Sequence, residues 1–62
     1  MSITIERNTA TGSYTASALV EDNYTPFAWY ERMTFLFTEE SEIKALFKEH
    51  LASKNLRIVK GN

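Results

Sequence analysis

The feature that most constrains the fold is a change of apolar period along the chain. Three stretches alternate apolar and polar residues, the pattern of a β-strand with one buried face. A single later stretch, from Ile43 to Leu51, repeats its apolar residues at spacings of three and four, which is the pattern of an amphipathic helix. The order therefore predicts an α+β domain: an antiparallel sheet with one helix packed on one face.

The three predicted strands cover residues 3–7, 13–20 and 29–37. Asn8 to Gly12 separates the first two strands and contains residues that favour turns, so we expect an antiparallel hairpin there. Pro26 disfavours regular structure between the second and third strands. The segment 56–60 is expected to form either a short fourth strand or an extended tail, so the sheet has three or four strands.

The helix is predicted to begin with Thr38 as its N-cap and to end near Lys54, with Asn55 as a C-terminal cap. Glutamates in its first turn suit the positive end of the helix dipole. Parity along the strands separates two faces of the sheet. The face towards the helix is expected to hold Ile3, Ile5, Tyr14, Ala16, Ala18, Met33, Phe35 and Phe37. The opposite face is expected to hold Thr4, Thr15, Ser17, Leu19, Tyr30, Arg32, Thr34 and Leu36.

Length limits the stability of such a domain. A chain of 62 residues forms one small domain and buries only about 60 % of the surface that its unfolded form exposes. It has no Cys, so neither a disulfide nor a thiolate metal site reinforces the core. Association with a second copy or with a larger protein would supply the missing burial.

The sequence offers little support for an enzyme or a metal site. His50 is the only histidine, and it flanks the apolar stripe of the predicted helix, where a packing role is expected. Residues three and four positions away from His50 supply no helical metal-ligand set. The two glycines are far apart and do not form a phosphate-binding loop. We therefore expect a non-enzymatic protein without a cofactor, a metal or a small-molecule substrate.

Two candidate binding surfaces remain. The favoured one is the uncovered sheet face with the loop before the third strand, which would bind a protein partner or a second copy of the chain. Aromatic and Arg side chains often anchor such interfaces. The candidate residues are Tyr24, Phe27, Trp29, Tyr30, Arg32 and Leu36. Phe27 and Trp29 either close the open end of the core or join this surface, and the sequence leaves both interpretations open.

The less favoured alternative is weak nucleic-acid binding. Acidic residues outnumber basic ones up to Ile43, and basic residues then predominate, at Lys44, Lys48, Lys54, Arg57 and Lys60. The order of elements resembles the latter part of a double-stranded-RNA-binding domain. That family has a Lys-rich helix start, however, whereas this chain has acidic residues at positions 39, 40 and 42, which would repel phosphate.

The N-terminal residues lack the basic start and apolar run of a secretory signal, and no apolar stretch approaches the length of about 20 residues needed to cross a bilayer. We therefore expect a cytoplasmic protein without a membrane partner.

Overall fold

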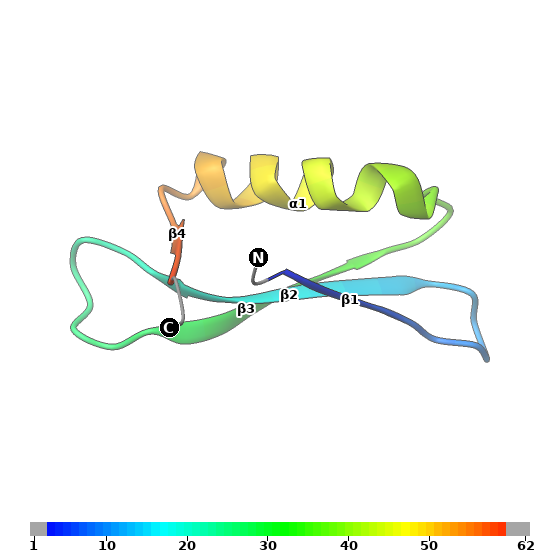
Figure 1. Ribbon diagram of the computed structural model, residues 1–62, viewed down its shortest axis with the longest axis horizontal. Coiled ribbons are helices and arrows are strands. Elements are labelled where there is room, and N and C mark those ends of the chain that lie inside the picture. The colour runs from blue at the N-terminus through cyan, green and yellow to red at the C-terminus, as the bar shows by residue number, and fades with distance from the viewer. Residues whose placement is uncertain (1–2, 60–62) are drawn as a thin grey trace.

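The computed structural model describes residues 3–59 and has the predicted α+β architecture, with a helix lying across an antiparallel sheet (Figure 1). In chain order, the elements are β1 (Thr4–Arg7), β2 (Tyr14–Glu21), β3 (Trp29–Phe35), α1 (Glu40–Ser53) and β4 (Arg57–Ile58). The segment after the helix thus contributes a short fourth strand. Lys60 lies outside the described residues.

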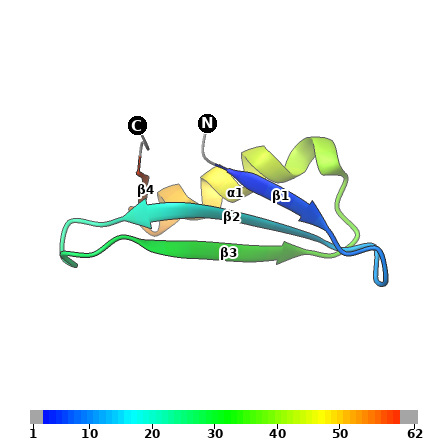
Figure 2. The same cartoon turned by 60° about the horizontal axis from the view of Figure 1, so that its bottom comes forward.

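β2 is the central strand of the sheet. It pairs with β3 along one edge, from Tyr14 opposite Phe35 to Val20 opposite Trp29. Its other edge is shared by β1, which pairs with residues 14–17, and β4, which pairs with residues 20–21. β1 and β4 therefore lie end to end beside β2, whereas β3 is the one described strand on the opposite side (Figure 2).

The turn between β1 and β2 is held by its own polar groups. The Asn8 side chain accepts hydrogen bonds from the amides of Ala10 and Thr11, and the Gly12 amide donates to the Asn8 carbonyl at 2.7 Å. Gly12 has a φ of 78°, a conformation that glycine adopts without the steric cost of a side chain. The predicted hairpin is thereby confirmed.

The core lies between β2 and α1, as the two apolar patterns predicted. Ala16, Ala18 and Val20 alternate along β2, and their small side chains allow close approach of the helix. The core residues that α1 contributes, Ile43, Phe47 and Leu51, are likewise buried. Each fully buried large side chain contributes roughly 1.5–3 kcal/mol relative to its exposed state, so this single layer of contacts is the main stabilising feature.

The prediction for Phe37 was wrong. Parity placed it in the core with Phe35, but β3 ends at Phe35, and Phe37 is fully exposed with a φ of 57°. The chain must reverse direction after β3 so that α1 can cross back over the sheet. This reversal removes Phe37 from the strand alternation and turns its side chain outward.

The helix also starts later than predicted. Glu39 is the N-cap and makes no side-chain capping bond, while the hydroxyl of Thr38 donates to the Leu36 carbonyl at 3.1 Å. Thr38 therefore stabilises the turn that precedes the helix. Glu40 and Glu42 lie in the first helical turn, where their charges complement the helix dipole.

Asn55, which was predicted to be the C-terminal cap, follows Lys54, the actual C-cap of the helix. It has a φ of 59°, and its amide donates to the Ala52 carbonyl, while the Leu56 amide donates to the Leu51 carbonyl at 2.9 Å. This pair of bonds is a Schellman motif, which satisfies carbonyl groups at the helix end. Leu56 then packs against the core and leads directly into β4.

Candidate functional site

The sheet face opposite the helix is uncovered by any element within residues 3–59, and we call it the free face (Figure 1). Its residues come from three strands: Thr4, Glu6, Thr15, Ser17, Leu19, Tyr30, Arg32 and Thr34. Tyr30 is 70 % exposed and Arg32 is also exposed. The predicted division of the strands into two faces is thus confirmed for Tyr30 and Arg32.

The free face contains a hollow of about 390 Å³. The strand register places Thr4 and Ser17 in one row with Arg32, and Glu6 and Thr15 in the next row with Thr34. The lining therefore combines a guanidinium, a carboxylate and hydroxyl groups beside the ring of Tyr30. No carboxylate within residues 3–59 is close enough to form an ion pair with Arg32. Such a surface can hydrogen-bond a partner and supply aromatic contact area.

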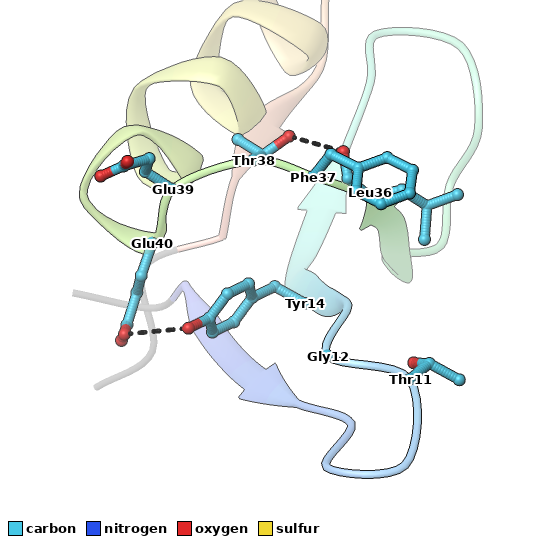
Figure 3. Close-up of a pocket in the computed structure, with 8 residues that line it drawn as sticks. All are labelled: Thr11, Gly12, Tyr14, Leu36, Phe37, Thr38, Glu39 and Glu40. Carbon is cyan, nitrogen blue, oxygen red and sulfur yellow. Dashed lines mark hydrogen bonds between the residues drawn. The ribbon is translucent and has the colours of Figure 1, made fainter.

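A second hollow, of about 490 Å³, lies where β3 leads into α1 (Figure 3). Leu36 is 62 % exposed and neighbours Phe37 in this turn. The Tyr14 hydroxyl donates to a carboxylate oxygen of Glu40 at 3.4 Å across the hollow. Sequence reasoning included Leu36 among the candidate residues but missed Phe37, because strand parity was extended past the end of β3. The need for a chain reversal before the helix was the available signal.

The loop between β2 and β3 projects beyond the sheet (Figure 1). Its aromatic residues are exposed. Tyr24 is 89 % exposed and Phe27 is 74 % exposed. Phe27 therefore does not cover the core. Asp22 shapes the start of this loop, because its carboxylate accepts hydrogen bonds from the amides of Thr25 and Tyr24. These bonds, that of Thr25 above all, lower the pKa of Asp22.

Trp29 lies on the helix side of the sheet and packs against the core, so it does not join Tyr30 and Arg32. Its indole Nε1 donates to Glu31 at 3.0 Å. The other oxygen of the same carboxylate lies 3.1 Å from His50 Nε2 and 3.3 Å from Lys54 Nζ. Hydrogen bonds from Trp29 first, and then from His50 and Lys54, lower the pKa of Glu31.

His50 is half-buried and its ring stacks on Phe47, with centroids 6.2 Å apart. The structure thus gives it the packing position that its place in the helical pattern predicted. Within residues 3–59, no group of three or more His, Cys, Asp or Glu side chains is arranged to hold a metal ion. No helix in the described part of the chain is long and apolar enough to cross a membrane.

The basic residues that were predicted to bind nucleic acid do not share one environment. Lys44 and Lys48 are exposed on α1, whereas Lys54 contacts Glu31. Arg57 donates to Asn23 at 2.6 Å and lies 3.4 Å from Glu21. Lys54 and Arg57, two of the residues predicted to contact phosphate, therefore already have acidic or polar partners within the chain.

Comparison with known proteins finds no match for this chain among protein-family models, curated proteins or solved structures.

Proposed function

We propose that this chain is a small non-enzymatic protein-interaction module that binds a protein partner through its free face. The main support is the position of Tyr30 and Arg32. Both side chains are exposed on the same face of β3, and no element within residues 3–59 covers that face. Tyr and Arg are enriched among the residues that dominate binding energy at protein interfaces. Leu36 and Phe27, which are also exposed, lie beyond the two ends of β3 and could add to this surface.

The polar part of the free face supports specificity. The hollow between Glu6 and Arg32 presents opposite charges with hydroxyl groups between them. A partner with complementary charges would gain directional hydrogen bonds there, and a partner with like charges would be rejected. A cytoplasmic location is part of this proposal, since extracellular domains of this size usually rely on disulfides and this chain has no Cys.

Nucleic-acid binding remains the alternative proposal, with less support. The chain has a formal net charge of −1 and a pI of about 5.7, whereas nucleic-acid-binding domains commonly have a pI above about 9. Lys44 and Lys48 are the basic residues of the described helix that stay available on its outer surface.

Site-specific photo-crosslinking tests the proposed interface. A benzophenone amino acid placed at Tyr30 is expected to crosslink the full-length chain to a discrete protein in a native lysate, or to itself. The same probe at Ala45, which is exposed on α1, is the matched control and should give no such product. Arg32→Glu should weaken the product from position 30 at least several-fold. Equal crosslinking from both positions, or none from position 30, would refute the free face as the interface.

A further inference from the structure

The outer edge of β3 is open. β3 has seven residues and pairs with β2 on one side, while no segment within residues 3–59 pairs with its other side (Figure 2). An open edge presents a row of unpaired amide and carbonyl groups that can pair with another strand. The edge on the far side of β2 is made of shorter strands, β1 and β4. β3 therefore offers the longest open edge in the described sheet.

An apolar groove runs beside this open edge. It has a volume of about 510 Å³, and we call it the β3 groove. It lies between β3 and α1 and is lined by Met33, Phe35, Leu46, Glu49, His50 and Ser53. The helix packs mainly over β2, so Met33 is only half-buried and Leu46 is 38 % exposed. The core is thus incompletely covered on the side where the backbone of β3 is also unpaired.

The charged residue on the helix side of β3 does not obstruct pairing at this edge. Inward-pointing charges can protect an edge strand, because pairing with another strand would bury them. The side chain of Glu31, however, is only 15 % exposed, and its carboxylate is bound by Trp29, His50 and Lys54 of its own chain. Its charge is compensated before any partner arrives.

We propose that a second copy of the chain fills this position, with the two β3 strands pairing antiparallel about a two-fold axis perpendicular to the sheet. This inference goes beyond the proposed function, because β3 pairs with its own copy through its open edge and not through the free face. This symmetry keeps both helices on one side of a continuous sheet. It also places the free faces of both copies on the other side.

The sequence of β3 selects one register for this pairing. Directly opposite residues share a face of the sheet. The two-fold axis, which lies between the two strands, must therefore be level with a residue, and that residue faces its own copy. A centre at Glu31 or at Arg32 would place two like charges directly opposite each other, which is destabilising. Centres nearer the ends, at Tyr30 or Thr34, pair much less of the strand. A centre at Met33 avoids both costs.

With Met33 at the centre, apolar contacts form on both faces, and on the helix side Phe35 lies opposite Glu31, which stays bound to Trp29, His50 and Lys54 of its own chain. Under the helices, Met33 lies opposite Met33 of the second copy and extends the floor of both β3 grooves. On the free face, Arg32 lies opposite Thr34, and Tyr30 lies opposite Leu36 as the chain leaves β3. Leu36 and Tyr30, which are 62 % and 70 % exposed, then become partly covered. The same contact thus covers the open core and the exposed aromatic ring.

Cysteine crosslinking tests the register, and the natural absence of Cys gives no background. Under mild oxidation with diamide, Met33→Cys should form a disulfide-linked dimer, because residue 33 faces its own copy. Arg32→Cys reports the competing register centred one residue earlier, and Tyr30→Cys is a control whose copies would lie far apart along the strand. We expect efficient crosslinking from Met33→Cys alone.

Charge substitutions at Thr34 test the same register without a crosslink. Thr34 is exposed and faces Arg32 of the second copy, so Thr34→Glu should tighten dimerisation and Thr34→Lys should weaken it. The two-fold axis produces this charge pair twice. We therefore expect Kd to fall about 2- to 30-fold with Thr34→Glu and to rise by a similar factor with Thr34→Lys. Sedimentation equilibrium measures Kd, and circular dichroism confirms that each variant is folded.

One further variant distinguishes pairing through the β3 edge from binding through the free face. Thr4→Lys changes the free face on β1, which β2 separates from the outer edge of β3, and should leave Kd unchanged if the dimer pairs through that edge. A dimer sensitive to Thr4→Lys but not to the Thr34 pair would overturn edge pairing in favour of stacked free faces. A chain that stays monomeric at all concentrations would also overturn it, while crosslinking from position 30 to a different protein would leave the proposed function intact.

Discussion

Phe35 and Phe37 are two residues apart and lie in opposite surroundings. Phe35 is 6 % exposed at the end of β3, and Phe37 is fully exposed in the left-handed region with a φ of 57°. A left-handed conformation costs an ordinary residue roughly 1–2 kcal/mol, and Asn tolerates it better. The side chain of Phe37 thus adds no core packing, while its backbone conformation opposes folding.

Substitutions at these two positions should therefore differ in sign. Phe37→Asn is expected to leave the free energy of unfolding unchanged or to raise it by up to about 1 kcal/mol, since strain is reduced and no core contact is lost. Phe35→Ala should lower it by about 3 kcal/mol or more, because a cavity forms. Urea denaturation measures both. A large loss of stability in Phe37→Asn would show that Phe37 packs in the core.

Glu31 links β3 to the last turns of α1 through one carboxylate. Its folded-state pKa is lowered, first by the bond from Trp29 and then by those from His50 and Lys54. In the unfolded chain it would titrate near its ordinary value of 4.5. Its contribution to stability is therefore complete above that pH and is lost as the pH falls through the lower folded-state pKa.

Glu31→Gln should make the loss of stability below pH 4.5 shallower than in the original chain. At neutral pH the substitution removes the charge that faces Lys54, at a cost of about 1 kcal/mol, but keeps an acceptor for Trp29. Thermal unfolding between pH 3 and pH 7 measures the effect. Glu6→Gln, in an exposed position on β1, is the comparison variant in which a different carboxylate is removed. An unchanged slope for Glu31→Gln would contradict the described contacts.

At the scale of elements, the end of α1 determines where β4 lies. Asn55 in the left-handed conformation turns the chain so that Leu56 meets the core and β4 reaches the edge of β2. The sequence placed the cap at Asn55, one residue after the observed C-cap Lys54, because Asn tolerates a positive φ beyond a helix end. It did not predict the pairing of β4, since a two-residue strand has too short a pattern to distinguish from a tail.

Replacing Asn55 tests the importance of this turn. Asn55→Gly should leave stability unchanged or slightly higher, because Gly adopts a positive φ without a steric cost. Asn55→Val should lower the free energy of unfolding by about 1–2 kcal/mol, since a β-branched side chain clashes in the left-handed region. Chemical denaturation of the matched pair provides the comparison. Equal stabilities would mean that residue 55 is not held in this conformation.

The start of α1 shows why local patterns mislead at junctions. Thr38 followed by glutamates has the composition of a helix N-terminus, and the alternation from Trp29 continues to Phe37. Both local signals extend into residues 36–38, but the chain needs these residues to reverse direction. The tertiary requirement prevails there, so β3 ends earlier and α1 begins later than either pattern predicts.

At the scale of the whole molecule, one helix covers one face of a small sheet, and nothing within residues 3–59 covers the other face (Figure 1). This arrangement and the exposure of Tyr30 and Arg32 could be predicted, because strand alternation specifies which residues share a face. The exposed position of Phe27 could not be predicted, because the loop lacks a repeating pattern of apolar residues. The β3 groove could not be predicted either, because it depends on where the helix axis crosses the sheet.

Amide hydrogen exchange on β3 at two protein concentrations tests most directly the claim that the open edge of this strand pairs with a second copy. The outward-facing amides of residues 29–35 should exchange rapidly in dilute solution and become protected at high concentration, when a second copy pairs with them. Amides of β1 should show no such dependence and provide the internal control. One concentration should lie well below the Kd of the dimer and the other well above it. Exchange rates on β3 that are the same at both concentrations would contradict pairing of this edge with a second copy.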